Sequence, residues 1–153
     1  MKKYILLLSL FVIGFSSCKK DAAFDPVKQA ATDDAAIQAY IKANNITATK
    51  DPSGLYYEVV TPGTGAYPTS TSIVTMNYSG KLLNGTVFDT GSINAEALTD
   101  LIKGWQIGVP YINVGGRLLL LIPSALGYGN QANGPIPANS VLIFTIDLTG
   151  FSN

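Results

Sequence analysis

A regular alternation near the C-terminus places the strongest constraint on the fold. Within residues 140–151 (SVLIFTIDLTGF), every second position from Leu142 to Leu148 is a large apolar residue, Phe144 and Ile146 included. The side chains of a β-strand point alternately to the two faces of its sheet. This period of two therefore predicts a strand with one face in an apolar core.

Shorter runs of the same kind precede this segment. Residues 54–60 (GLYYEVV), 72–80 (SIVTMNYSG) and 116–123 (GRLLLLIP) are rich in aliphatic and aromatic residues, and turn-forming sequences separate them. Asn84-Gly85, between two apolar runs, is a strong signal for a β-hairpin. These runs together predict a small antiparallel sheet.

One stretch in the same region favours a helix. Residues 101–112 (LIKGWQIGVPYI) are long enough for one short helix, and Pro110 limits its length because proline lacks a backbone donor. Residues 54–153 therefore predict one α+β domain of about 100 residues, with the sheet wrapped on the helix.

The first 17 residues have the pattern of a secretion signal. Lys2 and Lys3 supply positive charge, the twelve residues 4–15 are mostly apolar, and small residues precede Cys18. So short an apolar segment does not span a bilayer comfortably. The pattern resembles a bacterial lipoprotein signal, which implies that Cys18 becomes lipidated. We expect a lipid anchor in the bacterial cell envelope, most simply at the outer membrane, with the domain facing the periplasm or the surface.

Two segments separate this signal from the domain. Residues 18–32 are polar and small, which indicates a flexible tether. Asp33-Asp34, followed by an apolar stripe within residues 37–41, predicts a helix with acidic residues at its start. Residues 33–53 are therefore expected to form an N-terminal helix and a linker.

The composition excludes several kinds of chemistry. The chain has no histidine, and Cys18 is its only cysteine, which removes Ser-His and Cys-His catalysis and histidine-based metal sites. Lys+Arg and Asp+Glu balance at 10 each without a basic run in the domain, so nucleic-acid binding has no electrostatic support. Any activity must rely on carboxylates, tyrosines, backbone groups or an apolar cavity, and we expect no metal.

Residues 87–91 (VFDTG) raise the alternative of an aspartic protease, because such enzymes present their catalytic carboxylate in Asp-Thr-Gly. That chemistry needs two carboxylates about 3 Å apart. A short chain with one such motif would have to dimerise symmetrically. Tripeptide matches are common by chance, so we favour another role for Asp89.

Five short motifs follow one another along the domain. They are Tyr-x-Gly at 78–80, Phe-Asp at 88–89, Ile-x-Gly-Trp at 102–105, Gly-Tyr-Gly at 127–129, and Ile-Pro with Leu-x-Phe at 136–144. Each motif is weak alone, but in this order they resemble the FKBP-type peptidyl-prolyl cis-trans isomerases. The resemblance extends from Gly54 to Phe151 and implies a twisted antiparallel β-sheet curled around one short α-helix.

The resemblance also implies a proline-binding site. The residues implied as catalytic are Tyr78, Phe88, Asp89, Ile102, Trp105, Tyr128 and Phe144, with Leu101 and Ile136 as further substrate-binding residues. Trp105 would form the floor of the pocket and the other aromatic rings its walls. The Ile102 N–H would meet a substrate carbonyl, Tyr128 would hydrogen-bond from its loop, and Asp89 would accept a hydrogen bond at the pocket edge.

The implied substrates are proline-containing polypeptides. No cofactor is implied, because rotation about an X-Pro bond breaks no covalent bond. Residues 90–101 depart from the family pattern: they are several residues short and contain no aromatic residue, and Leu98 is expected to rebuild the missing wall. This departure leaves the binding of macrolide inhibitors open. It also leaves two hypotheses, an isomerase and a membrane-tethered chaperone module that binds proline or apolar peptides with little turnover.

Overall fold

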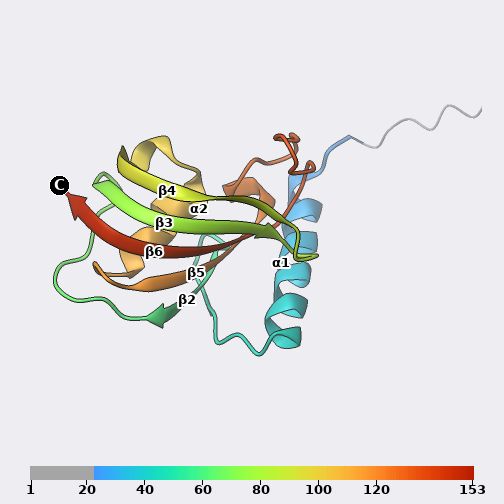
Figure 1. Cartoon of the computed structure of the whole chain (residues 1–153). Helices are drawn as coiled ribbons and strands as arrows, with labels where there is room; N and C mark the ends of the chain where they lie inside the picture. Colours follow the sequence, from blue (N-terminus) through green and yellow to red (C-terminus); the bar gives the residue numbers. More distant parts are fainter. Residues whose placement is uncertain (1–22) are drawn as a thin grey trace, which may run out of the picture.

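The computed structural model describes residues 23–153, so the expected signal segment and Cys18 lie outside the described part of the chain. The described residues form a six-stranded antiparallel sheet with strand order β1-β2-β5-β6-β3-β4 (Figure 1). The strands are β1 (Thr49–Lys50), β2 (Tyr56–Thr61), β3 (Ile73–Leu82), β4 (Val87–Ala97), β5 (Arg117–Ile122) and β6 (Leu142–Ser152). The helices are α1 (Pro26–Ala43) and α2 (Lys103–Gly108), and the short 3-10 helices are η1 (Leu98–Asp100), η2 (Val109–Tyr111) and η3 (Ser124–Leu126).

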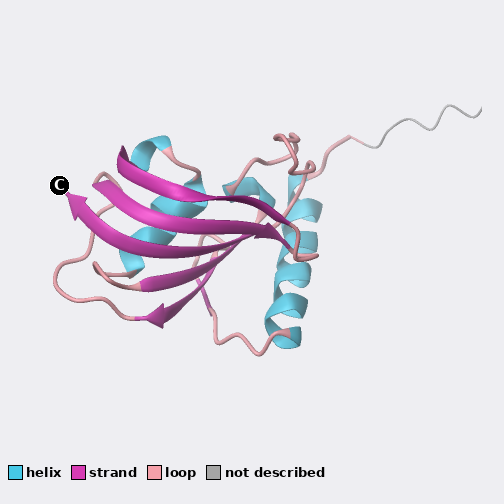
Figure 2. Cartoon of the chain, viewed as in Figure 1, coloured by secondary structure: helices cyan, strands magenta, loops and turns pink. Residues whose placement is uncertain are grey.

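The predicted alternating strand is β6, which lies in the interior of the sheet between β5 and β3. Leu142, Phe144, Ile146 and Leu148 are all buried in the larger apolar core. β5 contributes to the same core through alternate residues from Leu118. The helix α2 and the 3-10 helix η2 close this side of the sheet (Figure 2).

The predicted hairpin joins β3 to β4. Gly85 has a φ of 87°, a left-handed conformation that glycine adopts without steric cost. The Asn84 side chain accepts a hydrogen bond from the Thr86 N–H, and the Leu82 N–H donates to the Thr86 carbonyl. The turn therefore fixes the register in which β3 presents Tyr78 beside β4.

The helix α1 covers the opposite face of the sheet. Ile37 of α1 packs with Tyr56, Leu121 and Ile143, whose side chains alternate with those of the first core. Figure 1 shows α1 crossing the sheet close to the beginning of β6. Both faces of β5 and β6 are consequently buried where α1 lies. Within residues 23–153, no helix is both long enough and apolar enough to cross a membrane.

The predicted start of this helix is wrong. α1 begins at Pro26, and Asp25 is its N-cap, with a carboxylate that accepts hydrogen bonds from the N–H groups of Val27 and Lys28. An aspartate followed by proline at the first helical position is a strong start signal. The tether expected over residues 18–32 is therefore helical from Pro26 onward. Asp33, expected as a cap, is instead a buried residue in the middle of the helix.

The packing of α1 leads to a test of its contribution to stability. Ile37→Ala should lower the free energy of unfolding by about 2–5 kcal/mol, because it opens a cavity in the second core. Val27→Ala on the same helix is the matched control, because Val27 is 78% exposed and the change should stay within about 0.5 kcal/mol. Urea denaturation of both variants measures the difference. Equal stabilities would mean that α1 does not pack on the domain in solution.

Candidate functional site

A cavity of about 320 Å³ opens between β4, α2 and the loop that precedes β6. All the residues implied as catalytic or substrate-binding in the domain line it: Tyr78, Phe88, Asp89, Leu101, Ile102, Trp105, Tyr128, Ile136 and Phe144. They come from three strands, one helix and two connecting segments. The structure therefore brings together residues that are up to 66 positions apart (78 to 144).

The base of the cavity is a cluster of aromatic rings that meet edge to face. The Trp105 and Phe144 rings have centroids 5.0 Å apart and an interplanar angle of 88°. Tyr78 meets Trp105 at 5.1 Å, and Phe88 meets Phe144 at 5.5 Å. In such contacts the positive edge of one ring faces the negative face of the next. The result is an apolar cup with a fixed arrangement of rings.

Gly80 allows these rings to approach the strand β3. A Cβ atom at this position would lie 2.6 Å from carbon atoms of both Phe88 and Phe144. No side chain fits at that distance without moving both rings. Packing of the two rings therefore requires glycine at the third position of the Tyr-x-Gly motif, which the sequence pattern alone does not show.

The polar groups of the cup include one hydrogen-bonded pair at its edge. The Tyr78 hydroxyl donates to Oδ2 of Asp89 over 2.8 Å. Burial, and then this hydrogen bond, raise the pKa of Tyr78 to about 12. Asp89 itself is exposed, and no other carboxylate of residues 23–153 lines the cavity. The chain therefore forms no aspartic dyad within its described part.

Comparison with known proteins identifies the family of the domain. Residues 65–149 match the model of a family described as FKBP-type peptidyl-prolyl cis-trans isomerase. The chain belongs to this family. FkpA of Buchnera aphidicola subsp. Schizaphis graminum, named an FKBP-type peptidyl-prolyl cis-trans isomerase, is 42% identical over 109 residues, which cover 68% of this chain and 43% of that protein. FkpA of Escherichia coli K12 is 38% identical over 100 residues, which cover 63% of this chain and 37% of that protein.

Solved structures agree with this assignment. The crystal structure of FkpA from Escherichia coli superposes with a TM-score of 0.69 at 32% identity, covering 82% of this chain and 62% of that one. AtFKBP13 superposes with a TM-score of 0.64 at 31% identity, covering 69% of this chain and 98% of that one. The predicted FKBP-like α+β fold is confirmed. The chain spans less than half the length of the FkpA proteins that it matches.

One wall of the FKBP pocket differs from the prediction. Leu98 does not line the cavity; it is fully buried in the core, and its N–H donates to the Ser72 carbonyl. Ile93 supplies the wall instead. The pairing of β4 with β3 is regular from Asp89 to Ile93, so the alternate positions 89, 91 and 93 share a face. The period of two, extended from Asp89, could have identified Ile93.

The loop between β5 and β6 forms the opposite rim. Tyr128 is 37% exposed, as expected for a loop residue, whereas Ile136 is only 4% exposed and belongs to the core as well as to the cavity. Asn133 and Ile136 exchange two backbone hydrogen bonds of 2.9 Å, which fold the tip of the loop back toward the pocket. Ile136 is therefore held more deeply than a simple rim residue.

Two features of α2, the helix that carries Trp105, were not revealed by the motifs. Gln106 donates through Nε2 to the carbonyls of Leu101 (2.7 Å) and Thr99 (3.1 Å), which fixes the turn before α2. The indole N–H of Trp105 is buried without an acceptor among the described residues. Unpaired buried donors are rare in native proteins. This one belongs to the ring on which the cup is centred.

The raised pKa of Tyr78 gives a test of the polar edge. Asp89→Ala should lower this pKa from about 12 but leave it above the ordinary 10.0, because burial is the larger cause. NMR titration of labelled tyrosine measures the change. In the parent protein, a tyrosine that ionises later when folded adds stability below pH 10, and this contribution is lost as the pH rises from 10 toward 12. An unchanged pKa in the variant would show that the hydrogen bond is absent in solution.

Proposed function

We propose that this chain is a peptidyl-prolyl cis-trans isomerase that acts on proline-containing polypeptides during the folding of exported proteins. The observation that carries the proposal is the cup formed by Tyr78, Phe88, Trp105 and Phe144, which offers an apolar concave surface of the right kind for a proline ring. Membership of the FKBP family supports the same function.

Solvation accounts for the catalysis in this proposal. The barrier to rotation about a peptide bond is about 18–20 kcal/mol and comes from amide resonance. A planar amide is more dipolar than a twisted one, so transfer from water to an apolar cup disfavours the ground state relative to the transition state. The reaction requires no nucleophile, metal or general base. A chain without histidine can therefore catalyse this rotation.

Each group of pocket residues has a role in the proposed reaction. Trp105 supports the proline ring from below, and the other three rings surround it. The Ile102 N–H and the Tyr128 hydroxyl donate hydrogen bonds to substrate carbonyls, which aligns the peptide across the cup. Asp89 accepts a hydrogen bond at the edge, while Leu101 and Ile136 enclose the residues next to the proline. The exposure of Tyr128 and Asp89 supports these assignments, because a peptide reaches both from solvent.

The segment after Asp89 favours a second candidate function, a chaperone module that binds proline or apolar peptides with little turnover. Its wall is the aliphatic side chain of Ile93, and no aromatic residue lies between residues 89 and 101. Both candidates use the same cup and differ only in whether the bound amide rotates faster than in water. The same wall would contact a bound macrolide inhibitor, so the affinity for such inhibitors is a separate quantity to measure.

An exchange assay distinguishes the two candidates. Residues 19–153 should accelerate cis-trans exchange of an Ala-Xaa-Pro-Phe peptide, measured by NMR, and Asp89→Ala should reduce kcat/KM by about tenfold, the equivalent of ~1.4 kcal/mol. Glu96→Ala is the matched control, because Glu96 is an exposed acid on the same strand outside the cavity. Binding of the peptide without acceleration would establish the module instead. Unfolding by Asp89→Ala would assign Asp89 a structural role.

We further propose that Cys18 carries a lipid that anchors the protein in the bacterial cell envelope, at the outer membrane. The signal pattern of residues 1–17 supports this location. X-Pro isomerisation is a slow step in folding, so exported chains provide substrates in that compartment.

Cell fractionation tests the anchor directly. The parent protein should sediment with membranes, and Cys18→Ala should release it to the soluble fraction, because the lipid has no other attachment site in a chain with one cysteine. Mass spectrometry of the processed N-terminus provides the control. Release of the parent protein to the soluble fraction would contradict the proposal.

A further inference from the structure

The helix α1 precedes residues 65–149, which match the FKBP family, yet it contacts the loop that carries the pocket rim. The contact is made by Asp33, which is 2% exposed. A carboxylate is costly to bury unless its oxygens receive hydrogen bonds or a counter-charge. Asp33 therefore requires donors or a counter-charge close to its carboxylate.

Asp33 is satisfied by uncharged donors. Its Oδ2 accepts from the Ser124 N–H at 2.8 Å and from the Ser124 hydroxyl at 2.6 Å, and its Oδ1 accepts from Nε2 of Gln29 at 2.7 Å. The ion pairs formed within residues 23–153 involve other acids, Asp34 and Asp147. Ser124 is also 2% exposed. The pair is a buried link between α1 and the first residue of η3.

Backbone hydrogen bonds connect Ser124 with the rim of the pocket. Its carbonyl accepts from the N–H groups of Gly127 (3.0 Å) and Gly129 (2.8 Å), the two neighbours of Tyr128. The Gly129 carbonyl accepts a hydrogen bond from the Asn139 N–H at 2.8 Å. This bond joins the segment around Tyr128 to the end of the same loop. A continuous series of hydrogen bonds thus connects Asp33 with the segment that bears Tyr128.

We propose that Asp33 is a positioning residue for the substrate-binding loop of residues 124–139. Through Ser124, it holds the backbone on both sides of Tyr128 and fixes the place of Ile136 along the same rim. Its effect on turnover rests on the proposed isomerase function, whereas its effect on the loop does not. The helix outside the family match then supports the site through this one link, and loss of the link changes peptide binding.

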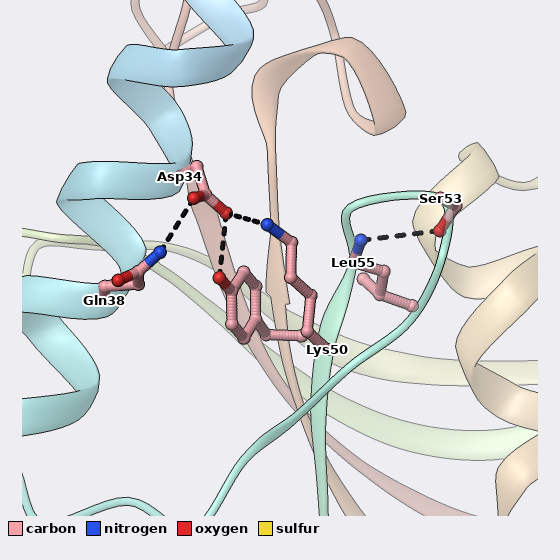
Figure 3. A network of polar contacts seen from close by, with 6 residues as sticks. Asp34, Gln38, Lys50, Ser53 and Leu55 are labelled. Atoms are coloured by element: carbon pink, nitrogen blue, oxygen red, sulfur yellow. Dashed lines mark hydrogen bonds and ion pairs between the residues drawn. The ribbon is translucent and has the colours of Figure 1, made fainter.

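Asp34 provides a matched control on the same helix. Figure 3 shows its carboxylate between Gln38 and Lys50, and it also accepts from the Tyr56 hydroxyl at 2.8 Å. Lys50 and Tyr56 lie on β1 and β2. Removing the Asp34 carboxylate therefore weakens the docking of α1 without touching the link to the loop.

The experiment compares Asp33→Ala with Asp34→Ala in the full chain. In Asp33→Ala, hydrogen exchange at the Gly129 and Asn139 amides should accelerate by about three- to tenfold, and KM for the proline peptide should rise by a similar factor with kcat preserved. Asp34→Ala should change neither. Asp33→Asn should retain most of the parent behaviour, because its side-chain oxygen still accepts from both Ser124 donors.

Ser124→Ala keeps the inference testable if Asp33→Ala does not fold. It removes the hydroxyl and retains the backbone donor, so smaller changes in the same direction are expected. The inference is overturned if the loop amides of the folded Asp33 or Ser124 variant exchange as in the parent, or if Asp34→Ala changes them equally. If the parent protein shows no turnover, the proposed function fails, and the exchange rates still decide whether Asp33 holds the loop.

Discussion

The contact between the rings of Trp105 and Phe144 joins the two layers on which the domain depends. Trp105 comes from α2 and Phe144 from the interior strand β6, and both side chains are 4% exposed. The pocket and the apolar core are therefore one continuous body of side chains, open to solvent on one side. Truncation of Trp105 would create a cavity in the core, so loss of activity in such a variant would say little about catalysis.

This arrangement separates the apolar and polar parts of the site by depth. The rings occupy the base, while Asp89 and Tyr128 stand at the edge, exposed to water. A bound proline would leave water for a surface without charge, and the adjoining peptide groups would meet hydrogen-bonding partners at the edge. The geometry thus favours a function based on desolvation and alignment over one based on bond-making chemistry.

The sequence was sufficient for those parts of the structure that rest on local periodicity and turn chemistry. The alternation in residues 142–148 and the Asn84-Gly85 turn predicted β6 and the β3–β4 hairpin, and the motifs predicted which residues would share a pocket. The position of Ile93 depended on whether β4 continued past Asp89, which pairing with β3 decides. The burial of Asp33 depended on a partner, Ser124, that lies 91 positions away (33 to 124). No local pattern encodes such a contact.

The order of the strands has a consequence for how the protein acquires its site. β6 follows all other strands in sequence, yet it pairs with β3 and β5 and supplies Phe144 to the base of the cup. The pairing of Tyr78 with Ile146 closes a long loop, and contacts of this kind form late and slowly. During synthesis or export, β3 and β4 emerge before the strand that completes their sheet. A protein proposed to assist the folding of others therefore has no binding pocket until its own folding is nearly finished.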